Sequence, residues 1–163
     1  MKIHIKWLRA FSWLLVVAWM FLIFFLSAQP AEQSSQLSGG ITDAVIETVE
    51  KVLPNVSINR DTVSHLIRKN AHFLAYLILG VLVTNALYQS SKLRGKQQIV
   101  LAFIICVLYA ISDEVHQLFV PGRSGEIRDV IIDSAGAAVG IFTFHLLILL
   151  GRKPLRKSKT NTQ

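Results

Sequence analysis

The sequence predicts an all-α integral membrane protein. We expect a four-helix bundle with both termini in the cytoplasm and an extracytoplasmic amphipathic helix between the first and second spans. Three observations predict this fold class. Hydrophobic residues make up 52% of the 163 residues, which is more than a soluble domain usually carries. Four apolar stretches approach the length that crosses a bilayer, and basic residues gather in short acid-free segments beside them.

The four spans follow from the lengths of the apolar stretches. A helix needs about 20 mainly apolar residues to cross the hydrocarbon core. The third stretch, 99–112, is short, and reaches this length only if its helix continues through 113–119. We therefore expect one membrane domain over residues 1–163. Its spans are predicted at about 7–26, 70–88, 98–118 and 129–150, its outer segment at 27–69 and its basic cytoplasmic tail at 151–163.

The distribution of charge predicts the orientation. Three segments contain basic residues and no acid, and the ten acidic residues all lie elsewhere. Because cytoplasmic flanks of membrane helices are enriched in Lys and Arg, both termini and the loop between the second and third spans are predicted to be cytoplasmic. The basic residues of these segments are Lys2, Lys6, Arg9, Lys92, Arg94, Lys96, Arg152, Lys153, Arg156, Lys157 and Lys159.

The first span has an alternative interpretation as a cleaved signal peptide. Ala28 and Ala31 have the spacing of a cleavage site. However, Pro30 lies between them, and the apolar run is longer than a usual signal core. These two features favour a retained first span.

The outer segment contains one amphipathic pattern. Residues 29–40 are rich in Ser, Gln and Gly and are predicted to form a loop. The following helix is predicted to end before Pro54, and is too short and too polar to span. It could pack on the helix ends as a lid or face the lipid as a gate. Its apolar positions are Leu37, Ile41, Val45, Val49 and Leu53.

Polar residues enter the second span from the outer side. Asn59 or Asp61 can cap a helix that continues unbroken into this span. At 3.6 residues per turn, five polar side chains of this helix project within about 100° of arc. They are His65, Arg68, Lys69, His72 and Tyr76.

The third span ends in a second polar group. Asp113, His116 and Gln117 share one helical face, and Glu114 points about 100° away from Asp113. Pro121-Gly122 then predicts a tight outer turn that carries Arg123.

The fourth span begins with acids above a glycine pair. Asp129 and Asp133 lie one turn apart on a face that continues through Gly136 and Gly140. The Gly-x-x-x-Gly spacing lets another helix approach closely. Ionisable residues at the ends of membrane helices predict a functional site. The alternative is a structural network in which Arg68, Lys69, Arg123 and Arg128 oppose Asp113, Glu114, Asp129 and Asp133.

Three ordered strings resemble the VanZ-like family: RKNAHFLAYLILG at 68–80, SDEVHQLFVPGR at 112–123 and RDVIIDSAGAAVG at 128–140. The string FLSAQ at 25–29 is similar too, so the resemblance covers about residues 7–150. The family is named after a teicoplanin-resistance protein, which implies a role at the bacterial cell envelope. The resemblance implies no biochemical activity.

These observations leave an enzyme and a non-catalytic accessory protein as alternatives. The expected partner is a membrane lipid, a lipid-linked cell-wall precursor or a glycopeptide antibiotic. Nucleic acid is excluded because no basic stripe is interleaved with aromatics. In the enzyme, His72 or His116 is the general acid or base, Asp113 or Asp129 orients it, and Glu114 or Asp133 supplies a second carboxylate. The ligand-binding candidates are Arg68, Lys69, Tyr76, Gln117, Arg123 and Arg128.

No cofactor is indicated and no metal site is assigned. His72, His116, Asp113 and Asp129 are suitable ligand types, but no H-x-x-x-H or H-E-x-x-H spacing supports a metal. The single cysteine, Cys106, lies in an apolar run, so the chain has no intramolecular disulfide.

Overall fold

The structure is a computed structural model that describes residues 2–52 and 59–151. This part of the chain forms five helices and no strand: α1 (Lys2–Ser27), α2 (Ala31–Val52), α3 (Arg60–Ser90), α4 (Lys96–Gln117) and α5 (Ile127–Gly151). All except α2 are long and apolar enough to cross a membrane. The all-helical class and the prediction of four helices long and apolar enough to span a membrane are therefore confirmed. Apart from Gly151, the predicted tail lies outside the described residues.

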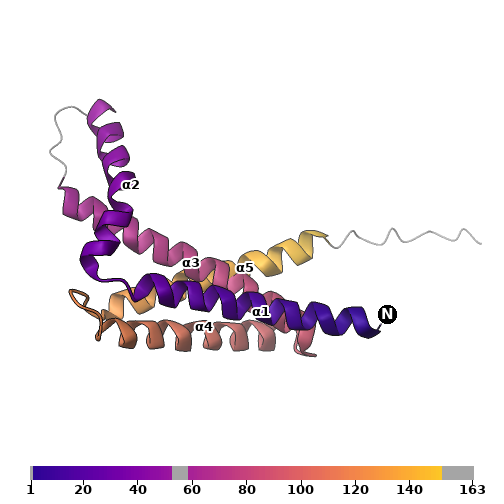
Figure 1. Ribbon diagram of the computed structural model, residues 1–163. Coiled ribbons are helices and arrows are strands. Elements are labelled where there is room, and N and C mark those ends of the chain that lie inside the picture. The colour runs from indigo at the N-terminus through magenta and orange to yellow at the C-terminus, as the bar shows by residue number, and fades with distance from the viewer. Residues whose placement is uncertain (1, 53–58, 152–163) are drawn as a thin grey trace, which may run out of the picture.

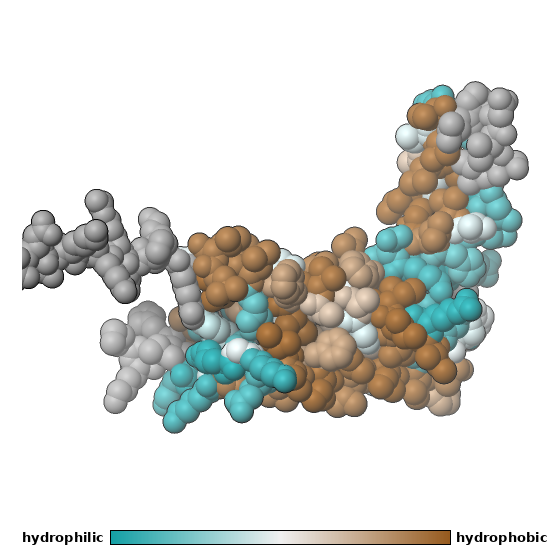
Figure 2. Space-filling model, turned by 180° about the vertical axis from the view of Figure 1, so that it is seen from behind, coloured by the Kyte–Doolittle hydropathy of each residue, from teal (hydrophilic) through white to brown (hydrophobic). Residues whose placement is uncertain are grey.

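The four long helices run side by side in alternating directions (Figure 1). The α1–α3 connection and the α4–α5 loop lie at one end of the bundle, here called the site end. The start of α1, the turn between α3 and α4 and the end of α5 lie at the opposite end (Figure 1). On the face shown in Figure 2, apolar residues cover the middle of the bundle and polar residues gather towards its two ends. This distribution suits a protein that crosses a bilayer.

Helix α2 departs from the prediction. The loop expected at 29–40 is wrong over most of its length, because α2 begins at Ala31 and includes the Ser- and Gly-rich segment. Glu32 in the first turn favours the helix through its charge. Packing on α3 adds tertiary support, including a 2.8 Å ion pair between Arg60 and Asp43. Local composition alone could not reveal that support. Helix α2 rises from the site end at a steep angle to the bundle (Figure 1).

Helix α3 lies at the centre of the fold and packs against each of the other four helices. Its start is fixed by Asn59, whose Oδ1 accepts hydrogen bonds from the backbone N–H groups of Asp61 at 2.9 Å and Thr62 at 3.3 Å. The predicted cap and the unbroken continuation into the second span are confirmed. Because α3 runs from the site end through the core, it positions polar residues directly above buried ones.

Glycine residues, which have no side chain, let α3 and α5 approach each other closely. A Cβ atom added at Gly136 would overlap the carbonyl of Phe73, and one at Gly140 would overlap the carbonyl of Leu77. A Cβ atom added at Gly80 of α3 would likewise overlap the carbonyl of Ala137 on α5. The close helix approach predicted from the glycine spacing is confirmed, and it involves a third glycine on the opposite helix.

Small residues and indole hydrogen bonds complete the packing. Helix α4 buries Ala102, Cys106 and Ala110 at successive turns, which forms a narrow face towards the core. Trp19 of α1 donates through Nε1 to the carbonyl of Ala75 at 2.9 Å. The core therefore fixes the relative positions of α1, α3 and α4 below the site end.

Candidate functional site

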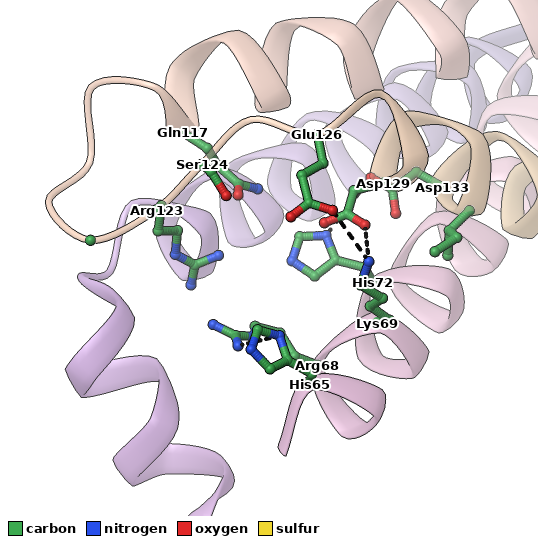
Figure 3. Close-up of a pocket in the computed structure, with 12 residues that line it drawn as sticks. His65, Arg68, Lys69, His72, Gln117, Arg123, Ser124, Glu126, Asp129 and Asp133 are labelled. Atoms are coloured by element: carbon green, nitrogen blue, oxygen red, sulfur yellow. Dashed lines mark hydrogen bonds and ion pairs between the residues drawn. The ribbon is translucent and has the colours of Figure 1, made fainter. Parts of the chain in front are cut away.

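Side chains from α3, α4, α5 and the α4–α5 loop form a polar pocket at the site end (Figure 3). Its volume is about 100 Å³, which suits a small polar group rather than a whole lipid. Three of the long helices therefore contribute polar groups at one depth, as the sequence predicted. The residues that line it are His65, Arg68, Lys69, His72, Gln117, Gly122, Arg123, Ser124, Glu126, Asp129, Ile132 and Asp133.

Lys69 is neutralised by acids at one wall of this pocket. Its Nζ lies 2.9 Å from Oδ1 of Asp129 and 3.5 Å from Oε2 of Glu126 (Figure 3). About a third of the Lys69 side chain and a quarter of the Asp129 side chain are exposed. The cluster joins α3 to the start of α5, and its two acids leave Lys69 no positive charge to offer an anionic ligand.

Arg68 and Arg123 differ from Lys69, since neither pairs with a carboxylate among the described residues. Nε of Arg123 donates to the carbonyl of Gln29 at 3.0 Å, and Arg68 contacts Nδ1 of His65 at 3.0 Å. Burial, together with the neighbouring charge of Arg68, lowers the pKa of Arg123. The guanidinium group of Arg123 nevertheless stays protonated at neutral pH. Two like charges therefore border one pocket, which favours an anionic ligand.

His72, Asp113 and Asp133 meet beneath the arginines. Nδ1 of His72 lies 3.7 Å from Oδ2 of Asp133, an ion-pair distance that is too long for a hydrogen bond. Asp133 is fully buried and Asp113 is 2% exposed. One ligand atom from each of these three residues lies within 4.8 Å of the others. This set, which differs from the four ligand types considered in the sequence, is the metal-binding candidate among the described residues.

The carboxylates of this group have few partners. Ser27 donates its hydroxyl proton to Oδ2 of Asp113 at 2.8 Å. Oδ1 of Asp113 and both oxygens of Asp133 are buried without a hydrogen-bond partner in the described part of the chain. Buried carboxylate oxygens normally have partners. The site therefore contains acceptor atoms that are available to a cation, a ligand proton or water.

Glu114 and Gln117 lie next to each other at the end of α4, but they have different roles. Oε2 of Glu114 accepts the backbone N–H of Glu126 at 2.9 Å. Nε2 of Gln117 lies 3.4 Å from Oε1 of Glu114 and 3.4 Å from Oγ of Ser27. Gln117 lines the pocket, whereas Glu114 does not. Glu114 therefore anchors the α4–α5 loop to the end of α4.

Besides Asp113 and Glu114, three further predicted site residues do not line the pocket. The His116 ring packs on Phe24 of α1, with 4.2 Å between ring centroids. Tyr76 is fully buried and its hydroxyl has no hydrogen-bond partner among the described residues. Arg128 is exposed in the first turn of α5. The pocket thus selects His72 rather than His116 as the histidine that can act on a ligand.

Several contributing residues were not predicted as site residues. Ser27 and Gln29 hold Asp113 and Arg123, although their string at 25–29 was noted only for its resemblance. Ser124 lines the pocket from the loop. His65 lies on the predicted polar stripe and does face the pocket. A polar pair directly after the first apolar run was the available signal for Ser27 and Gln29.

An apolar groove adjoins the polar pocket. Its volume is about 470 Å³, and its walls come from α1, α2 and α3. Arg68, His72 and Arg123 border both the groove and the pocket. The groove therefore leads from an apolar surface to a cationic end. Its other lining residues are Trp19, Leu22, Ile23, Leu26, Ser27, Gln29, Ile41, Ile67, Ala71, Leu74, Ala75 and Ile78.

Comparison with known proteins gives the family. The VanZ/LLP1 family model matches residues 11–149, which contain all four long helices apart from their outermost residues. The chain belongs to the VanZ/LLP1 family. No curated protein and no solved structure matches it. Family membership and four helices able to cross a membrane together make this VanZ/LLP1 member a multi-pass membrane protein.

Proposed function

We propose that this VanZ/LLP1 protein binds the phosphate-bearing head of a membrane lipid or lipid-linked precursor at the outer face of the cytoplasmic membrane. The observation that carries the proposal is the junction of groove and pocket at Arg68, His72 and Arg123. An amphiphile has the same division, with a hydrocarbon chain next to an ionic head. The volume of the groove falls in the range of small-molecule sites.

The arginines favour phosphate over a neutral headgroup. A guanidinium offers parallel N–H donors that match phosphate oxygens. Arg68 and Arg123 have no carboxylate partner among the described residues, so a phosphate need not displace an internal ion pair. Lys69 has two such partners and is therefore assigned to holding the helices together.

The outward direction of the site is supported by the positive-inside pattern. The site end lies opposite the turn that contains Lys92 and Arg94 and is followed by Lys96, the first residue of α4. With that turn in the cytoplasm, the pocket faces the extracytoplasmic side at headgroup depth. In this position the protein meets lipid-linked cell-wall precursors, which connects the proposal to glycopeptide resistance of the teicoplanin type.

Chemical modification of the headgroup is a second candidate, favoured by the position of His72. Its imidazole borders the pocket and lies 3.7 Å from Asp133, which can orient it. A histidine in this setting can accept or donate a proton near neutral pH. A purely structural role is favoured for the cluster of Lys69, Asp129 and Glu126, whose charges pair with one another. It is not favoured for Arg68 and Arg123, which have no carboxylate partner among the described residues.

The binding proposal is tested with protein purified in nanodiscs of neutral lipid doped with a polyprenyl phosphate or phosphatidic acid. Retention of the anionic lipid is measured by native mass spectrometry. The double variant Arg68→Gln/Arg123→Gln should retain at least about tenfold less, since two charge-assisted contacts are lost. Arg128→Gln is the matched control, because Arg128 is exposed and does not line the pocket. Equal retention by the double variant and wild type would refute the proposal.

A further inference from the structure

We propose that His72, Asp113 and Asp133 bind one divalent transition-metal ion of the Mn²⁺ or Zn²⁺ class. The three residues come from α3, α4 and α5, respectively. Their candidate ligand atoms lie within 4.8 Å of one another. Ligand atoms around a tetrahedral ion with bonds of about 2.1 Å lie roughly 3.4 Å apart. The ligand atoms therefore need to approach one another by at most about 1.4 Å, which side-chain rotations can supply.

The second observation is that three carboxylate oxygens of this group lack a hydrogen-bond partner among the described residues. Both oxygens of Asp133 and Oδ1 of Asp113 are buried without a hydrogen-bond partner in the described residues. The nearby cations do not satisfy them: Lys69 is paired with Asp129 and Glu126, and Arg123 donates to Gln29. Burial of carboxylate oxygens without hydrogen-bond partners is costly. A divalent cation between them would remove that cost.

The donor set indicates the class of metal. One imidazole nitrogen and two carboxylate oxygens form a mixed set, whereas Ca²⁺ and Mg²⁺ favour oxygen alone. Imidazole suits zinc and carboxylate suits manganese. Ser27 donates its hydroxyl proton to Oδ2 of Asp113 and leaves Oδ1 for the ion. A hydrogen bond of this kind orients a carboxylate that binds a metal.

The polar pocket next to the three ligands would let a bound ion contact a ligand in the pocket. Three protein ligands leave at least one coordination position open. His72 and Asp133 both line the polar pocket, so this position faces Arg68 and Arg123. If the proposed function holds, a phosphate oxygen of the lipid head occupies it. This last step rests on the proposed function, while the metal site itself does not.

The test uses the full chain, purified in detergent with a tag that contains no histidine, stripped with a chelator and reloaded with Mn²⁺ or Zn²⁺. Wild type should retain one ion per chain after desalting, as measured by elemental mass spectrometry. Asp133→Asn should weaken binding by more than about tenfold, because even indirect changes around a metal cost 10- to 100-fold. Asp61→Asn is the matched control, because Asp61 is an exposed acid in the first turn of α3 that lines neither the pocket nor the groove, and it should bind as wild type does.

A second measurement keeps the test valid if Asp133→Asn does not fold. Pulsed electron paramagnetic resonance of bound Mn²⁺ should show coupling to one imidazole nitrogen in wild type. His72→Asp supplies an oxygen in place of that nitrogen, so the coupling should vanish. Absence of a stoichiometric ion in wild type, wild-type affinity in Asp133→Asn, or persistent coupling in His72→Asp would each overturn the site.

The outcomes separate this inference from the proposed function. Lipid retention that depends on Arg68 and Arg123 in a protein that binds no ion would remove the metal site and leave the function standing. Stoichiometric Mn²⁺ at the three residues without lipid retention would do the reverse.

Discussion

The side chain of Ser27, the last residue of α1, donates a 2.8 Å hydrogen bond to Oδ2 of Asp113 on α4. Both residues are buried. The bond joins the first span to the third at the depth of the pocket. It also fixes one oxygen of Asp113 while the other stays without a partner among the described residues. Ser27 is therefore a positioning residue for the site.

Ser27→Ala should lower the free energy of unfolding by about 1–3 kcal/mol, because it leaves a buried acceptor without its donor. Chemical denaturation in detergent, followed by circular dichroism, measures the change. Ser12→Ala is the control, since Ser12 is also buried in α1 but donates to Leu8 of its own helix. The two variants should differ clearly, and equal losses would argue against the α1–α4 connection.

Gly136→Ala should destabilise the protein by about 1–3 kcal/mol, because the new Cβ meets the carbonyl of Phe73 in a close-packed crossing. Gly40→Ala makes the same change in α2, where nothing lies within 4 Å of the added atom. That control should gain about 0.5–1 kcal/mol from helix propensity. Unfolding midpoints in a denaturing detergent give both values. Similar shifts of one sign would contradict the crossing.

Ala71→Phe should obstruct the apolar groove, which Ala71 lines from α3. We expect weaker retention of a long-chain phospholipid, while binding of a short-chain analogue with the same head persists, since the arginines are unchanged. Fluorescent-lipid displacement measures both affinities. Ala10→Phe, at an exposed position of α1 outside the groove, is the matched control. Loss of both ligands would indicate a folding defect rather than a blocked groove.

The orientation predicts which cysteines a membrane-impermeant maleimide reaches in intact cells. In a Cys106→Ala background, Gln33→Cys on α2 should react, because the site end is predicted to face outward. Gln97→Cys at the start of α4 should react only after permeabilisation. Both positions are exposed, and Cys106 is fully buried. The reverse labelling pattern would invert the topology.

Much of the fold could be predicted because it depends on local patterns. Apolar length gave the spans, the polar side chain of Asn59 gave the start of α3, and Gly136 and Gly140 gave the close crossing. The loop expected at 29–40 was wrong because packing on α3 supports a helix that its composition does not favour.

The site was less predictable because its contacts join distant segments. Helical phase placed His116 beside Asp113, and both contact the end of α1, but His116 packs its ring on Phe24 and does not line the pocket. Among the described residues, only Lys69 of the four opposing bases forms an ion pair with the predicted acids. The roles of Ser27 and Gln29 depend on where the first span ends relative to α4 and its loop. No spacing along one helix contains that information.

The glycine contact between α3 and α5 also determines the distance between two side chains of the site. Gly136 faces the carbonyl of Phe73, the residue next to His72, and lies three positions beyond Asp133 on the same helix. The separation of the two backbones therefore controls the separation of the imidazole and the carboxylate. A change in the distance between α3 and α5 would therefore change the distance between His72 and Asp133. The contact between α3 and α5 thus fixes a distance on which the geometry of the site depends.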